Sequence, residues 1–144
     1  MHQLPHHYAV KASAGSDTPV RLTAEGLAPI ESAAPVEFDG PGDLWSPESL
    51  LVAAVADCFI LSFRAIARAS RLNWSDLSCG VEGLLDKTES GLRFTNFAIS
   101  AVLTIPSPDD SDRAEKLLHK AEHACLITNS LTAKSELLAT VTVS

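Results

Sequence analysis

The feature that most constrains this chain is a helical stretch from Ser46 to about Ser70 that carries apolar side chains on nearly every face. Ser46 is a candidate N-cap, Pro47 suits the first helical position, and Glu48 suits the positive end of the helix dipole. A helix that is apolar all round must be buried on all sides. The rest of the chain offers few elements to cover it, so we expect a second copy to do so, in a homodimer.

Cys58 lies in the middle of this helix, and its interpretation decides most of the function. A free thiol in an apolar helix is either an inert small hydrophobe or a protected reactive centre. Cys125 lies in a later helical segment, and only the fold could bring the two cysteines together. Cys79 alternates with Leu77 and Val81 in a predicted strand that points it toward the core, so we expect it to be inert.

The remaining pattern predicts an α+β fold, in a single domain spanning residues 1–144, with mostly antiparallel pairing. The turn at Gly15–Pro19 predicts a hairpin between the first two strands. Strands are predicted near residues 6–14, 20–25, 77–85, 93–105 and 137–143, with a short strand at 36–38. Helices are predicted at about 112–124 and, as a short helix or turn, within 125–133.

Composition and charge exclude several classes of protein. The net charge of −7 argues against nucleic acid and anionic membrane surfaces as partners. The apolar run from Leu50 to Phe63 is too short to span a bilayer, and Asp57 interrupts it, so we expect no membrane segment. The first residues lack a signal-peptide pattern, and three cysteines do not suit a secreted disulfide framework. These features predict a cytoplasmic location.

Two further groups could carry chemistry. His119 and His123 share a helix face near Cys125 and could hold zinc, but no third ligand is evident, so we expect no metal. Glu48 cannot touch Cys58 of its own helix, because ten residues span about 15 Å. It either stabilises the helix dipole or serves a reactive site by reaching another subunit's cysteine or by orienting a third residue.

Three segments together resemble one known family. They are Pro35–Gly42, Ser46–Phe59 with Cys58, and Ala121–Leu131 with Cys125. They resemble the OsmC/Ohr family, the osmotically inducible protein C and organic hydroperoxide resistance proteins. The resemblance implies an OsmC-like fold, in which long central helices are buried against each other in an intertwined homodimer. It also implies a thiol peroxidase that uses no metal or organic cofactor.

The resemblance also implies residue roles. The residue matching Cys58 attacks an organic hydroperoxide, and the residue matching Cys125 resolves the intermediate. The residue matching Glu48 orients an arginine that activates the thiolate. Electrons come from a dithiol or a lipoylated protein.

Two departures mark this chain as a divergent member. Ser16 stands where we expect the activating arginine, which leaves Arg21 as the only arginine of the N-terminal region, on either face of its strand. Leu126 stands where many members have proline. We therefore expect a thiol-dependent peroxidase of oxidative stress defence, with Cys58, Cys125, Glu48 and Arg21 as catalytic residues. The alternative is a non-catalytic dimer of the same fold that binds a small apolar ligand or senses oxidants.

Overall fold

The structure is a computed structural model that describes the whole chain from Met1 to Ser144. It divides into two compact units, Met1–Leu50 and Leu51–Ser144, which are described separately below. The single domain of the sequence analysis stays a prediction.

The first unit is built around a small antiparallel sheet of β1 (Lys11–Ser13), β2 (Val20–Thr23) and β3 (Ile30–Ser32). The predicted hairpin is confirmed, with Ala12 opposite Leu22. The first strand is shorter than predicted, because residues 6–10 form no strand, and β3 was not predicted.

The predicted strand at Val36–Phe38 is wrong, because these residues form the 3-10 helix η1. Asp39 follows in the left-handed conformation, and its N–H donates to the Val36 carbonyl, which closes a tight turn. At Gly40 a Cβ would lie 1.6 Å from the carbonyl oxygen of Ala34, so only glycine fits this close backbone approach.

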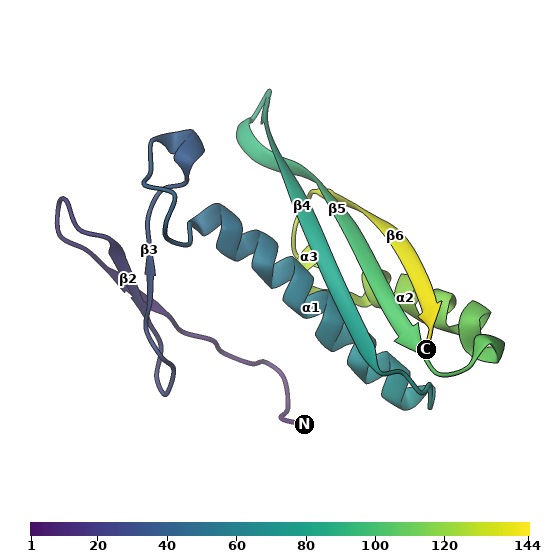
Figure 1. Cartoon of the computed structure of the whole chain (residues 1–144). Helices are drawn as coiled ribbons and strands as arrows, with labels where there is room; N and C mark the ends of the chain where they lie inside the picture. Colours follow the sequence, from purple (N-terminus) through teal and green to yellow (C-terminus); the bar gives the residue numbers. More distant parts are fainter. The chain divides into compact units, whose positions relative to one another are not determined.

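The second unit contains a three-stranded sheet in the order β4 (Asp76–Thr88), β5 (Gly91–Ile105) and β6 (Lys134–Val143). The β4–β5 pair is antiparallel, whereas β5 and β6 run parallel, as Figure 1 shows, so the sheet is mixed. Parallel neighbours need a long crossover connection. Here it consists of η2 (Pro108–Asp110), α2 (Ser111–Ala124) and α3 (Leu126–Asn129).

Helix α1 (Pro47–Ala69) confirms the predicted long helix. Ser46 caps it, because its hydroxyl accepts from the Ser49 N–H at 3.1 Å while the Ser46 N–H donates to the Ser49 hydroxyl at 2.8 Å. By length and composition α1 could also cross a membrane, with a mean hydropathy of 2.1 over its most apolar window. Core helices of soluble proteins meet the same criterion, so the absence of a membrane segment stays a prediction.

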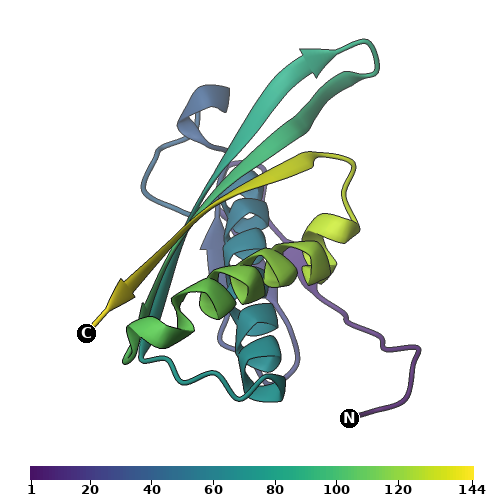
Figure 2. The same cartoon turned by 90° about the vertical axis from the view of Figure 1, so that its right-hand side faces the viewer.

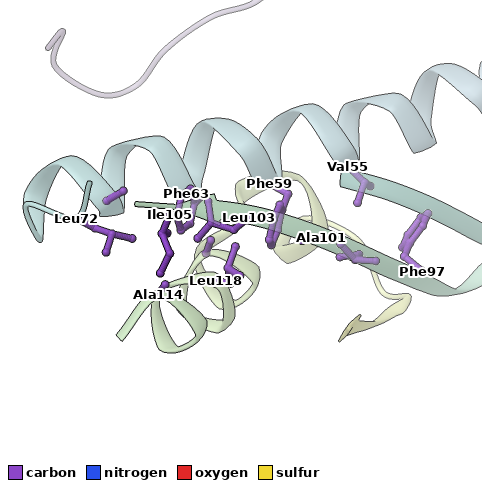
Figure 3. Close-up of a cluster of buried hydrophobic side chains, with 13 residues drawn as sticks. Val55, Phe59, Phe63, Leu72, Phe97, Ala101, Leu103, Ile105, Ala114 and Leu118 are labelled. Carbon is purple, nitrogen blue, oxygen red and sulfur yellow. The ribbon is translucent and has the colours of Figure 1, made fainter. Parts of the chain in front are cut away.

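The core of the second unit lies between α1, α2 and one face of the sheet. Figure 2 shows α2 running across the direction of α1. In Figure 3, Phe59 and Phe63 of α1 meet side chains of β5 and α2. The partners include Leu103, Ile105 and Leu118, all fully buried. Phe63 also packs edge-on against Trp74, with ring centroids 5.5 Å apart.

The rest of the α1 surface is not covered. Only 22% of its most apolar window is buried, and Leu61 is 52% exposed. The second unit alone therefore does not provide the all-round burial that the sequence predicts. The homodimer that would provide it stays a prediction.

Candidate active site

The Cys58 thiol is half-buried on α1 and is surrounded by hydrogen-bond donors. Burial raises its pKa, but hydrogen bonds from the Ile127 N–H, the Cys125 thiol, the Ser62 hydroxyl and the Leu126 N–H outweigh burial and lower the pKa below its ordinary value. No charged side chain contributes to this shift. The surroundings of Cys58 thus favour the thiolate, which is the nucleophilic form.

Cys125 lies between α2 and α3, and its side chain is fully buried. Its carbonyl oxygen accepts from the Asn129 N–H at 3.0 Å and from the Thr128 hydroxyl at 3.2 Å. The side-chain amide of Asn129 donates to the His123 carbonyl at 3.0 Å. These bonds hold the segment that presents the Cys125 thiol and the neighbouring N–H groups to Cys58. Both cysteines are free thiols.

Cys79 is half-buried on β4, and its environment has the opposite effect. Burial, and secondly the charge of Cys125, raise the pKa of Cys79 to about 11. A thiol with such a pKa is almost entirely protonated near neutral pH. This supports the expectation that Cys79 is inert.

In the first unit, Arg21 pairs with Glu31 across the β2–β3 register at 3.7 Å, and both side chains are more than half exposed. Val20 and Leu22, on either side of Arg21, line a hollow of about 570 Å³ that Glu48 also lines. Because side chains alternate along a strand, Arg21 lies on the other face. The structure therefore does not pair Arg21 with Glu48. The role of Arg21 toward Cys58 stays a prediction.

Glu48 is left without a partner. Its Oε1 atom is buried and makes no hydrogen bond. A buried carboxylate oxygen without a donor is destabilising, typically by about 1–3 kcal/mol. The remaining lining of the hollow is mostly apolar: Ala12, Val20, Leu22, Ser32, Ala33, Ala34, Pro35, Phe38, Pro47 and Leu50. The Oε1 atom of Glu48 is thus free to accept a hydrogen bond.

One contact within the helix links the two histidines of α2. The Nδ1 of His123 bonds the backbone carbonyl of His119 at 2.8 Å, which is a contact within the helix. The chain contains no group of three or more His, Cys, Asp or Glu side chains that could hold a metal ion.

One protein family matches most of the chain. Residues 40–138 match the family model for OsmC-like proteins. The chain belongs to the OsmC-like family. The matched range contains Glu48, Cys58 and Cys125, whereas Arg21 lies outside it.

Other OsmC-like proteins resemble this chain over nearly its full length. It is 29% identical to the uncharacterized protein YmaD of Bacillus subtilis over 136 residues, which are 92% of this chain and 91% of YmaD. An organic hydroperoxide resistance protein OsmC from Legionella pneumophila superposes with a TM-score of 0.76 at 28% identity, covering 97% of this chain and 99% of that one. These likenesses confirm the predicted family.

The predicted fold is confirmed by a further structure. The OsmC-like protein VCA0330 of Vibrio cholerae superposes with a TM-score of 0.81 at 20% identity, covering 93% of this chain and all of that one. The two chains share the α+β arrangement with its long helix. The intertwining of two copies stays a prediction.

Sequence reasoning on this OsmC-like chain missed three of the donors around Cys58. Ser62 could have been found, because it stands one helical turn after Cys58 on the same face. The N–H groups of Leu126 and Ile127 could not, because backbone donors have no sequence pattern of their own. Leu126 was noted only as a departure from proline, yet proline has no N–H to donate.

Proposed function

We propose that this chain is a thiol-dependent peroxidase that reduces organic hydroperoxides, with Cys58 as the attacking and Cys125 as the resolving cysteine. The observation that carries the proposal is the Cys58 thiol of lowered pKa facing the Cys125 thiol. Family membership and the similarity to an organic hydroperoxide resistance protein support it.

The reaction balances with these two thiols and an external reductant. The Cys58 thiolate attacks the distal oxygen of ROOH, the O–O bond breaks, and the alkoxide takes a proton to leave as ROH. Cys58 is left as a sulfenic acid. The Cys125 sulfur then attacks the Cys58 sulfur, which releases water and forms a disulfide. A dithiol, either free or on a lipoylated protein, returns two electrons and two protons to the disulfide.

The first unit supplies the supporting residues in this proposal. Glu48 orients Arg21, which stabilises the thiolate and the departing alkoxide. For this, Arg21 must leave Glu31 and reach the opposite face of its strand, where the unpartnered Oε1 of Glu48 can accept a hydrogen bond. A homodimer that covers α1 completes the proposed enzyme, and the three free cysteines support a cytoplasmic location.

The test is a steady-state assay with cumene hydroperoxide and dihydrolipoamide, followed by peptide mapping under non-reducing conditions. We expect hydroperoxide consumption and a Cys58–Cys125 disulfide, with Cys79 left as a free thiol. The Cys125→Ser variant should consume about one equivalent of hydroperoxide and then gain oxygen atoms at Cys58, because no thiol resolves the sulfenic acid. No consumption, or a Cys58–Cys79 disulfide, contradicts the proposal.

One observation favours a second function. The hollow of about 570 Å³ in the first unit is largely apolar, and Arg21 points away from it. A chain that binds a small apolar ligand there, or that senses oxidants through Cys58 without turnover, would need no activating arginine. A chain that forms the Cys58–Cys125 disulfide but is not re-reduced by dithiols would support this second function.

A further inference from the structure

Ser62 interrupts the most apolar part of α1, one turn after Cys58 and between the buried Phe59 and Phe63. Residues four apart lie on the same helix face. The Ser62 Oγ atom is 3.9 Å from the Cys58 Sγ atom, and Ser62 makes no other side-chain hydrogen bond. The only polar contact of this hydroxyl is therefore the sulfur that reacts in the proposed function.

A purely structural role explains Ser62 poorly. Serine is a weaker helix former than alanine, and a serine within a helix either points its hydroxyl into solvent or bonds it to the carbonyl four residues earlier. That carbonyl belongs to Cys58, but the hydroxyl contacts the Cys58 sulfur instead. The half-buried position also costs the hydroxyl part of its hydration. Alanine would satisfy the helix and the packing at least as well.

The four donors around Cys58 have two origins. Cys125, Leu126 and Ile127 are consecutive, and they belong to the segment that also delivers the resolving thiol. Ser62 alone belongs to the helix that carries Cys58, so its distance from the sulfur is fixed by the helix itself. Cys125 is the one donor among the four that is consumed when a disulfide forms. When Cys125 bonds to Cys58, Ser62 is the side-chain donor that does not change.

We propose that Ser62 is a catalytic hydrogen-bond donor to Cys58, which donates its O–H first to the thiolate and then to the oxygen of the sulfenic acid. In the neutral thiol either atom could be the donor. A thiolate sulfur can only accept, so ionisation fixes the direction of the bond. The reaction itself rests on the proposed function, whereas the bond to the thiolate does not.

The decisive experiment compares Ser62→Thr with Ser62→Val in the full chain. Threonine and valine share shape and branching, but only threonine keeps the hydroxyl. The first readout is the rate at which iodoacetamide labels Cys58 across a pH series, measured on the Cys58 peptide. The second is the rate of the first turnover with cumene hydroperoxide. We expect labelling at pH 7 and first turnover to be about threefold to tenfold slower in Ser62→Val than in Ser62→Thr.

Equal labelling profiles for the two variants would overturn the proposal, because the hydroxyl would then have no effect on the thiolate. If either β-branched variant fails to fold, Ser62→Ala against the unsubstituted chain decides the question in the same way. Ser70→Ala, which removes a hydroxyl just beyond the end of α1, is the control and should change neither rate. A chain that consumes no hydroperoxide contradicts the proposed function, while the labelling difference would still support Ser62 as the donor to the thiolate.

Discussion

The two units of the chain bury their apolar side chains in opposite ways. All buried hydrophobic side chains belong to Leu51–Ser144, where α1, α2 and the sheet enclose them. In Met1–Leu50 the buried residues are Ser32 and Ser46. The larger apolar side chains of this unit are exposed, among them Leu27, Ile30, Phe38 and Trp45. The second unit is thus stabilised by its own core, whereas the first has a sheet without a core.

The two units also differ in the groups that they contribute to the chemistry of Cys58. Every group that lowers the pKa of Cys58 belongs to the second unit. The first unit contributes Arg21, which is exposed, and Glu48, which lacks a hydrogen bond at Oε1. The comparison predicts that substitutions in the second unit change the pKa of Cys58 directly. Substitutions in the first unit should change this pKa only through contacts that the first unit makes with other parts of the protein.

The largest effect is expected from Cys58→Ser. Hydroperoxide consumption should fall by at least about a thousandfold, because the hydroxyl of serine is a far weaker nucleophile without a base to activate it. The matched control is Cys79→Ser, which removes the other half-buried thiol of the second unit and should keep most of the activity. Loss of activity in the control would mean that Cys79 takes part in the reaction.

Removing an apolar side chain should affect the free energy of unfolding differently in the two units. Phe59→Ala removes a fully buried ring and should lower the free energy of unfolding by about 3–5 kcal/mol. Leu27→Ala, at a side chain that is 69% exposed, should change it by no more than about 0.5 kcal/mol. Urea denaturation measures both. A large loss in Leu27→Ala would show that the apolar surface of the first unit is covered, as by a second copy.

The thiols of the second unit should differ in reactivity with pH. Because the pKa of Cys58 is lowered and that of Cys79 is raised to about 11, iodoacetamide at pH 8 should label Cys58 at least about thirtyfold faster. The difference should shrink as the pH rises toward 11, since Cys79 then ionises too. Labelling followed by peptide mapping measures the ratio, and similar rates at pH 8 would contradict it.

The part played by the first unit is tested by Arg21→Ala. If Arg21 activates Cys58, its loss should raise the Cys58 pKa and slow the peroxide reaction by at least about tenfold. The pKa is measured by thiolate absorbance near 240 nm. Lys11→Ala removes a cation from the neighbouring strand and serves as the control. If both properties stay unchanged, Arg21 is a surface residue and activation belongs entirely to the second unit.

The smallest effect is expected from Leu126→Pro, which deletes one backbone donor. The Leu126 side chain is 68% exposed and the residue begins α3, where proline is well tolerated. Labelling of Cys58 at pH 7 should slow by about threefold, because the lost N–H helped to lower the Cys58 pKa. Leu126→Ala keeps the N–H and should match the unsubstituted chain. A slower Leu126→Ala would instead assign the effect to the side chain.

The sequence predicted best those elements whose signals lie within a few neighbouring residues. The cap at Ser46 and the apolar run after it predicted α1 almost to the residue, because both act within a few positions. The three residues of β3 lie between Pro29 and Ala33, too short a stretch to show alternation. The parallel pairing of β5 with β6 depends on long-range packing, which no local pattern contains.

The candidate site also contains residues that sequence motifs predicted and contacts that depend on the fold. Cys58 and Cys125 were found through their motifs, and the fold brings them together. The pairing of Arg21 with Glu31 was not foreseen, because strand register decides it. The sequence suggested a nearby cation for Cys58, which stays a prediction, and it did not suggest the hydrogen bonds that lower its pKa.

The crossover between β5 and β6 also carries three of the donors that lower the pKa of Cys58, and it is synthesised late. Synthesis runs from the N-terminus, so α1 and Cys58 leave the ribosome well before Cys125, Leu126 and Ile127. Parallel pairing joins distant residues and therefore forms slowly. Until the segment between β5 and β6 has folded, Cys58 lacks three of the four donors that lower its pKa. The lowered pKa of Cys58 is thus a property of the completed fold, and a growing chain carries this thiol with the ordinary pKa of an exposed cysteine.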